Sequence, residues 1–224
     1  FLAGGWSIKS MPRQIMLSAA YQMASVENDD YAERDPENKS LWRFQRRRLS
    51  AEEIRDALLK ISGKLDVSMG GPHPFKIEWS WRYSQHKPFV DDFPTRRRSV
   101  YLMQQRIRHQ PFLATFDGAD SNMATGKRGS STTPQQALFM MNNKFVHEMA
   151  AAFAARTLAV SEQSDARLAH AFLHILGRQP TTEEKRDALG FIDQFETVPG
   201  VNGQGAWSAF VRVLFSGNEF MFVE

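Results

Sequence analysis

Apolar residues recur three to four positions apart along much of the chain, and this spacing predicts amphipathic helices. The first helix is expected over residues 6–24. A second begins at Ser50, because the serine hydroxyl can cap the helix while Glu53 reaches back to the Ser50 backbone, and Gly63 ends it. The positions expected on the buried faces of these two helices are Ile8, Met11, Ile15 and Ala19 in the first, and Ile54, Ala57, Leu58 and Ile61 in the second.

From Pro134 onward the pattern is helical throughout. Thr133 caps the first helix of this half, and a second is expected over residues 165–176. A third begins at Thr181, with Glu184 completing another capping box. Short links between these helices favour antiparallel neighbours in a bundle. The side chains expected to be buried include Leu138, Met141, Phe145, Met149, Phe153, Leu189, Ile192, Phe195, Trp207, Phe210, Val211, Leu214 and Phe215.

Residues 70–94 follow a different pattern, because glycine and proline punctuate them and apolar positions alternate with polar ones. Ile77, Trp79, Trp81 and Tyr83 fall on one face, which predicts a strand. A second strand is expected over residues 99–103. The predicted fold class is therefore mainly α, an antiparallel helical bundle with a small β-ribbon or hairpin insertion.

We expect a single domain over residues 1–224 that lacks its first segment, since the chain begins at Phe1 and not at a methionine. Its parts would be N-terminal helices in 1–69, the ribbon and a long loop in 70–133, and the helical bundle in 134–224. No stretch approaches the roughly 18 to 20 apolar residues of a membrane helix, so no membrane span is expected.

Charge and cysteine content exclude several classes of site. The chain has no cysteine, which excludes disulfides, thiolate metal sites and covalently attached haem in this segment. Residues 1–110 carry 19 lysines and arginines against 13 acidic residues, whereas residues 111–224 carry 9 against 12. The basic excess includes two arginine triplets, Arg46–Arg48 and Arg96–Arg98. No nucleic-acid-binding motif accompanies them, so pairing with carboxylates of the fold is expected instead of nucleic acid.

Two groups of residues are candidate chemical sites. His170 and His174 lie four apart, but no HExxH glutamate accompanies them and arginines flank them, so we expect no metal site. Asp117 and Asp120 are the acids that a glycosidase would need, yet three positions apart in a glycine-containing loop they are typical turn formers. A structural ion pair between Asp117 and Arg128 is a further hypothesis.

The predicted aromatic strand is the candidate ligand-binding surface. Trp79, Trp81 and Tyr83 present flat apolar faces on which sugar rings can stack, and Arg82 and His86 beside them suit an acidic or sulfated polymer. The alternative, that the aromatic residues face inward and cover a helix, stays open.

Seven blocks of sequence follow one another along the chain: WSIKSMPRQIMLSAAYQMAS, LSAEEIRDALLKISGKLD, RRRSVYLMQQR, FLATFDGAD, GKRGSSTTPQQAL, LGRQPTTEE and FSGNEFMFV. In this order they resemble the planctomycete-specific domain 1, a C-terminal family of unknown function in exported, often cytochrome-c-linked proteins. The resemblance covers essentially the whole chain and implies a periplasmic, cell-surface or secreted location and other domains in the same polypeptide. It carries no catalytic residue, and Arg98, Asp117 and Arg128 stand in matching blocks as candidates for a structural network.

Together these features predict a non-catalytic interaction or scaffold domain of an exported multidomain protein. Its partners would be other domains of the same polypeptide, with an acidic or sulfated polysaccharide as a candidate ligand and no cofactor in this segment. Two alternatives stay open: an enzyme that hydrolyses glycans, and a docking module for a c-type cytochrome domain.

Overall fold

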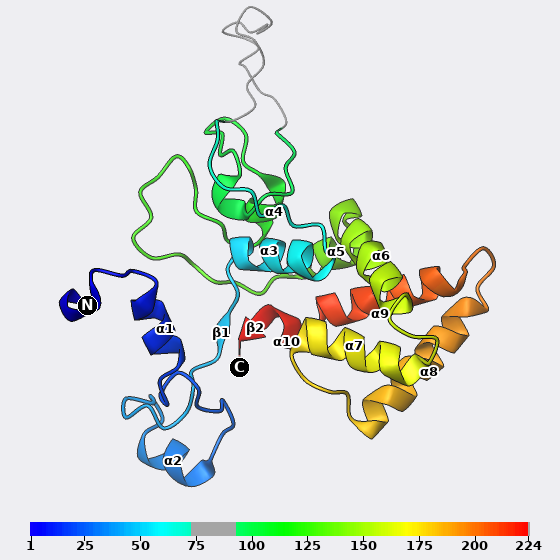
Figure 1. Ribbon diagram of the computed structural model, residues 1–224, viewed down its shortest axis with the longest axis horizontal. Helices are drawn as coiled ribbons and strands as arrows, with labels where there is room; N and C mark the ends of the chain where they lie inside the picture. Colours follow the sequence, from blue (N-terminus) through cyan, green and yellow to red (C-terminus); the bar gives the residue numbers. More distant parts are fainter. Residues whose placement is uncertain (73–92, 224) are drawn as a thin grey trace, which may run out of the picture. The chain divides into compact units, whose positions relative to one another are not determined.

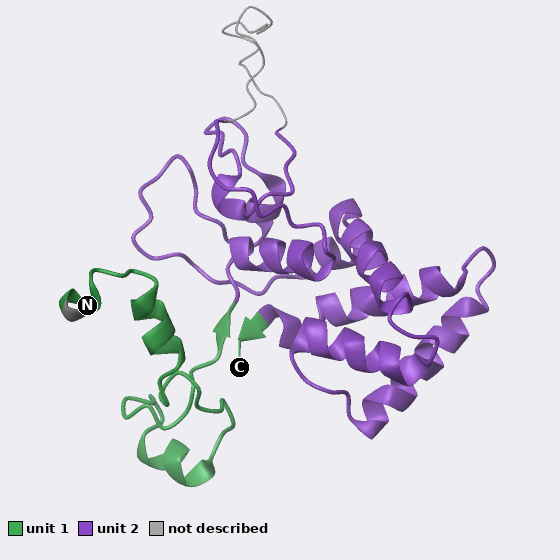
Figure 2. Cartoon of the chain, viewed as in Figure 1, with its two compact units in different colours: residues 1–48, 222–224 green, residues 49–221 purple. Residues whose placement is uncertain are grey.

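The computed structural model describes residues 1–72 and 93–223, and it confirms a mainly helical fold with a small two-stranded antiparallel sheet (Figure 1). The chain divides into two compact units (Figure 2). One comprises residues 1–48 with 222–224, and the other residues 49–221. Among the described residues, no helix is long and apolar enough to cross a membrane. The single-domain organisation stays a prediction.

The sheet belongs to the first unit and joins residues that lie far apart in the sequence. Strand β1 (Arg47–Arg48) pairs antiparallel with β2 (Phe222–Val223), so one of the two arginine triplets contributes backbone to a sheet. The Arg46 guanidinium lies 5.5 Å from the centre of the Phe222 ring. The predicted strand over 77–84 lies outside the described residues.

The first predicted helix is much shorter than expected. After a 3-10 turn η1 (Leu2–Gly4), α1 spans only Ser10–Met16 and buries no residue. Pro12 explains the late start, because proline fits the first turn of a helix but clashes in its interior. Helix α2 (Asp29–Arg34) occupies part of the polar connection that follows.

The second unit begins with α3 (Ala51–Ile61), where the predicted capping box of Ser50 and Glu53 is present and Gly63 follows with a φ of 72°. Ile54 and Leu58 are buried as expected. The strand predicted over 99–103 is wrong: Ser99–Tyr101 forms a 3-10 turn, η3, because Asp56 accepts hydrogen bonds from the backbone and the hydroxyl of Ser99. The short helix α4 (Pro111–Thr115) follows.

The long helix predicted from Pro134 is two helices. Helix α5 (Pro134–Asn142), capped by Thr133, ends where Asn143 turns extended, and Asn143 caps α6 (Lys144–Leu158) by accepting a hydrogen bond from the Phe145 backbone. The break changes the face that each helix presents. Leu138 and Met141 are therefore 57% exposed, against expectation, whereas Met149 and Phe153 are buried.

The remaining helices pack around α9 (Gly203–Ser216), which contacts α5, α6, α7 (Ser164–Leu176), α8 (Thr182–Glu196) and α10 (Asn218–Met221). The predicted capping box of Thr181 and Glu184 is present at the start of α8. The buried side chains of α9 include four predicted from the sequence: Trp207, Phe210, Val211 and Phe215.

Arg178 joins three of these helices. It follows α7, its Nη1 and Nη2 donate to Glu184 in α8 at 2.8 and 2.6 Å, and its Nε and Nη2 donate to Glu219 in α10 at 2.6 and 2.8 Å. Bidentate pairing of this kind is the strong geometry for an arginine. The Arg178 guanidinium lowers the pKa of Glu184 to about 2, and the hydrogen bond from the Thr181 backbone adds to this effect.

We expect the Arg178 ion pairs to stabilise the protein above the ordinary pKa of Glu184, 4.5, with the contribution lost as pH falls toward 2. Arg178→Gln should lower the free energy of unfolding at pH 7 by about 1–2 kcal/mol, allowing for partial solvent exposure. The free energy of unfolding of Arg178→Gln should also fall less steeply than that of the wild type between pH 5 and 2.5. Urea unfolding across this range measures both effects.

The matched control is Arg186→Gln, because Arg186 pairs with Asp187 on the exposed surface. This substitution should change the free energy of unfolding by less than about 0.5 kcal/mol. Equal free energies of unfolding of the two variants at pH 7 would contradict the stabilising role of the Arg178 ion pairs. The same would follow if the stability of Arg178→Gln and of the wild type fell equally steeply with falling pH.

Candidate functional site

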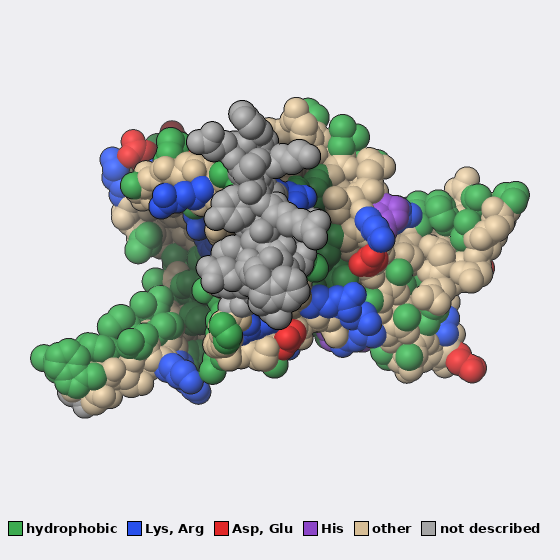
Figure 3. Space-filling model, turned by 90° about the horizontal axis from the view of Figure 1, so that it is seen from above, with side chains coloured by type: hydrophobic (Ala, Val, Ile, Leu, Met, Phe, Trp, Pro, Cys, Tyr) green, Lys and Arg blue, Asp and Glu red, His purple; other side chains and the backbone are tan. Residues whose placement is uncertain are grey.

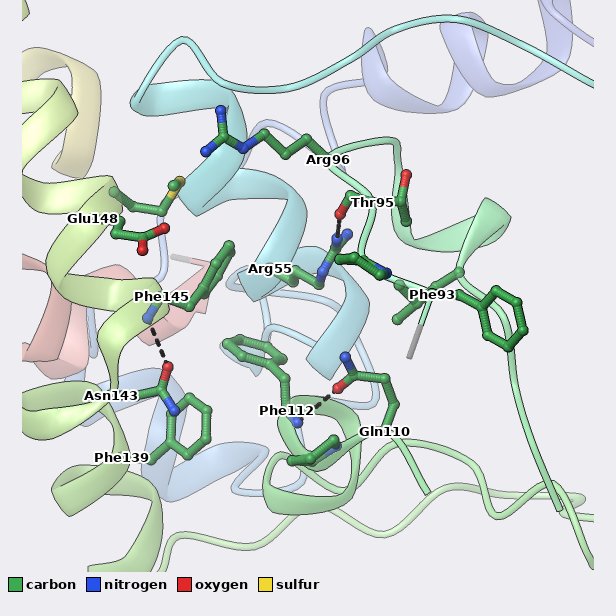
Figure 4. Close-up of a pocket in the computed structure, with 14 residues that line it drawn as sticks. Arg55, Phe93, Thr95, Arg96, Gln110, Phe112, Phe139, Asn143, Phe145 and Glu148 are labelled. Atoms are coloured by element: carbon green, nitrogen blue, oxygen red, sulfur yellow. Dashed lines mark hydrogen bonds between the residues drawn. The ribbon is translucent and has the colours of Figure 1, made fainter. Parts of the chain in front are cut away.

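A cavity of about 500 Å³ lies in the second unit, between α3, α4, α5, α6 and the segment that begins at Phe93. Figure 4 shows Phe139, Phe145 and Glu148 on one side of this cavity, with Thr95 and Gln110 on the other. We call it the phenylalanine pocket. Its volume is in the range of small-ligand sites in proteins.

Three phenylalanines form one aromatic cluster at this pocket. The Phe112 ring centre lies 5.5 Å from that of Phe139 and 5.8 Å from that of Phe145, and both pairs are edge to face. Phe112 and Met149 are buried and form the apolar base, while Phe139 and Phe145 are half-buried. The edge-to-face geometry fixes the rings and favours a well-shaped apolar surface.

Arg55 on α3 holds the segment that forms the opposite wall. Its side chain is only 6% exposed, and its Nη1 and Nη2 donate to the carbonyls of Arg97 and Thr95 at 3.0 and 2.5 Å. Nη1 also donates to Ser99 Oγ at 3.1 Å. Burial lowers the pKa of the Arg55 guanidinium, and the Asp56 carboxylate, 3.5 Å away, opposes this. These hydrogen bonds compensate the buried charge.

The rim of the pocket is polar, but several of its side chains are already engaged in hydrogen bonds that cap helices. Gln110 Oε1 accepts from the Phe112 backbone and caps α4, and Asn143 caps α6. Arg96 and Glu148 are exposed. Within the described part of the chain, no hydrogen bond or ion pair engages the Arg96 side chain, whereas Glu148 lies 3.8 Å from Lys144.

A second cavity, of about 400 Å³, continues from the phenylalanine pocket. The two share five lining residues, and the second cavity adds Arg108 and His109. We call the two cavities together the groove. Figure 3 shows Lys and Arg side chains at several separate places on the face in view, with fewer acidic side chains. The shared residues are Phe93, Pro94, Leu102, Gln110 and Pro111.

The predicted network residues have structural partners. Asp117 accepts from the backbone and the hydroxyl of Ser131 at 2.8 Å each, and Gln136 Nε2 lies 3.3 Å from Asp117. Arg128 donates to Glu52 of α3 at 2.6 Å. The direct pair between Asp117 and Arg128 stays a prediction. Both ends of the long loop are thus anchored.

The third network candidate, Arg98, is exposed and lies 5.9 Å from the centre of the Tyr101 ring. It lines a separate cavity of about 700 Å³ with Glu52, Glu53 and Asp56. Those three carboxylates bond to Arg128, the Ser50 backbone and Ser99 respectively, so they serve the fold.

The two histidines of α7, His170 and His174, make contacts within the fold. His170 Nδ1 lies 3.1 Å from the Thr157 hydroxyl and its ring stacks on Phe153, while His174 Nδ1 lies 3.0 Å from the His170 carbonyl. Burial, with His174 and Arg156 nearby, lowers the pKa of His170. Among the described residues, no cluster of three or more potential metal-ligating side chains occurs.

Asp120, the other acid weighed for catalysis, accepts from the Asn122 backbone at 2.8 Å and lies 3.4 Å from His109. It therefore acts as a turn former, as expected. The aromatic binding surface predicted from the sequence, comprising Trp79, Trp81, Arg82, Tyr83 and His86, lies outside the described residues. The groove itself was missed, because its aromatic side chains come from separate stretches without a shared motif.

A family model supports the resemblance deduced from the sequence blocks. The model of PSD1, a protein of unknown function (DUF1553), matches residues 1–192. No curated protein and no solved structure matches the chain.

Gly118, beside Asp117, provides a test of the local geometry. A Cβ at this position would lie 2.7 Å from the carbonyl oxygen of Leu113 in α4 and 2.8 Å from Leu113 Cβ. Gly118→Ala should therefore lower the free energy of unfolding by about 1–3 kcal/mol, because backbone has to move. Thermal or urea unfolding measures the change.

Gly129→Ala in the same loop is the control, since nothing lies within 4 Å of a Cβ there. It should leave stability within about 0.5 kcal/mol of the wild type. Equal effects of the two substitutions would show that the Leu113 backbone does not approach Gly118 this closely.

Proposed function

The chain belongs to PSD1, a family of proteins of unknown function, and from the phenylalanine pocket we propose that it is a non-catalytic interaction domain. The phenylalanine pocket would hold an apolar side chain of a partner. The observation that carries this proposal is the pocket's apolar base and walls, Phe112, Phe139, Phe145 and Met149. Burying an aromatic side chain there would contribute about 2–3 kcal/mol.

The charged groups around the pocket support binding over catalysis. Glycoside hydrolysis uses two carboxyl groups on either side of the scissile bond. Among the described lining residues, Glu148 is the one carboxylate. Arg55 is committed to backbone carbonyls, and Asp117 is bonded to Ser131 in the loop. The described lining therefore supplies one of the two acids that glycoside hydrolysis uses.

The cellular setting is part of the same proposal. The family resemblance supports a location outside the cytoplasm and a partner that is another domain of the same polypeptide. Nothing in the proposed role requires a cofactor. A polysaccharide ligand would depend instead on Trp79 and Trp81, which lie outside the described residues.

Binding of a minimal aromatic probe tests the proposal. N-acetyl-phenylalanine amide should bind with a dissociation constant on the order of 10 mM, and N-acetyl-alanine amide should not bind measurably. Phe145→Ala removes one wall of the pocket and should weaken binding at least about fivefold. Ligand-detected NMR, with unfolding curves to show that each variant is folded, measures this.

Leu138→Ala is the matched control, because Leu138 is exposed on the adjacent helix α5 and does not line the pocket. It should bind the probe as the wild type does. Should Phe145→Ala fail to fold, the smaller change Phe139→Leu replaces it. Undiminished binding by a folded pocket variant, or no preference for phenylalanine over alanine, would refute the proposal.

A further inference from the structure

A cavity apart from the groove lies where α9 packs against α8 and α5 (Figure 1), and its volume is about 350 Å³. It shares no lining residue with the groove. We call it the Arg212 pocket. Its volume is at the small end of the range of ligand sites in proteins. One face of α9 contributes four of its described lining residues, three and four positions apart: Ala209, Arg212, Val213 and Ser216.

Apolar side chains form most of the remaining lining. Phe191 and Phe195 of α8 are half-buried, with ring centres 5.6 Å apart and planes only 20° from parallel. Met141 of α5 and Val213 of α9 are 57% and 53% exposed. Apolar side chains that gather at one open cavity are typical of a binding site. A ligand with an apolar body would remove this surface from water.

Arg212 brings a positive charge to this cavity, and no carboxylate in the described part of the chain pairs with it. Its Nη1 lies 2.9 and 3.1 Å from the two ring nitrogens of His147, which carries no negative charge. Its Nε is buried and has no hydrogen-bond partner among the described residues. Because a half-buried charge without a counterion is costly, the site favours a ligand that supplies an anion.

Two donors are available to that anion. Within the described residues, Nη2 of Arg212 makes no hydrogen bond and, unlike Nε, is not buried. The half-buried hydroxyl of Ser216, one helical turn further along α9, makes none there either. A carboxylate accepts through two oxygens, and its hydrogen bonds from a guanidinium are stronger than those between neutral groups. One carboxylate can therefore use both donors.

We propose that the Arg212 pocket binds a small monocarboxylic acid with an apolar body. The ligand carboxylate accepts hydrogen bonds from Arg212 Nη2 and the Ser216 hydroxyl, and the apolar body covers Phe191, Phe195 and Met141. A single negative charge matches the described lining, which holds one arginine and no other charged side chain. This site is independent of the phenylalanine pocket and of the role proposed for it.

Three probes separate the two halves of the ligand: 3-phenylpropionate, its uncharged amide, and acetate, which lacks the apolar body. Binding to the full chain at pH 7 is followed by NMR of ¹³C-methyl methionine, because Met141 lines the Arg212 pocket and Met149 the phenylalanine pocket. 3-Phenylpropionate should shift the Met141 resonance and not that of Met149. It should bind at least about fivefold more tightly than the amide, and acetate should cause no shift.

Arg212→Gln should bind 3-phenylpropionate and the amide equally, because it loses the charge and retains the apolar walls. The control is Arg186→Gln, an exposed arginine of α8 outside the pocket, which should keep the preference for the acid. Unfolding curves show that each variant is folded. Should Arg212→Gln fail to fold, Arg212→Met, which keeps an apolar stem, replaces it.

The other outcomes would overturn the proposal. One is equal binding of the acid and the amide by the wild type, and another is a preference for the acid that survives in folded Arg212→Gln. A shift of Met149 without one of Met141 would place the probe in the phenylalanine pocket. Tighter binding of N-acetyl-glycyl-phenylalanine than of 3-phenylpropionate would identify the carboxyl end of a peptide as the ligand in place of a small acid.

Discussion

The second unit depends on one buried charge, the guanidinium of Arg55. It donates to two carbonyls and a hydroxyl of residues 95–99, and the adjacent Asp56 accepts from the backbone and the side chain of Ser99. Moving this segment away would leave the Arg55 charge without its hydrogen bonds in an apolar setting, which is costly. Because the same segment forms a wall of the phenylalanine pocket, the pocket persists as long as these bonds do.

The sequence blocks that resemble the family are joined in space by polar contacts. Arg55 and Asp56 bind the block that contains Ser99, Asp117 binds Ser131, and Arg178 binds Glu184 and Glu219. In each case the charged group is committed to the fold. A catalytic group instead needs geometry that leaves it able to exchange a proton with a substrate. The charged residues of these blocks therefore hold the fold together.

Local signals were predictable from the sequence and long-range ones were not. The capping boxes at Ser50 and Thr181 are confirmed, because cap and partner lie three residues apart. The break at Asn143 was missed although asparagine is a strong helix cap. The strand predicted at Ser99 is wrong because the hydrogen-bond partners of Ser99, Arg55 and Asp56, lie more than 40 residues earlier in the chain. The groove could not be predicted from the sequence for the same reason, since Phe112, Phe139 and Phe145 come together only in the folded chain.

Amide hydrogen exchange in an Arg55→Met variant tests most directly whether Arg55 holds the pocket wall. Methionine keeps the apolar stem but leaves two carbonyls without a donor, each costing about 1–3 kcal/mol. The amides of Ser99, Tyr101 and Leu102 should therefore exchange at least about tenfold faster than in the wild type, while those of α8 and α9 stay unchanged. Unchanged exchange at these three amides, or equal acceleration throughout the chain, would contradict the claim.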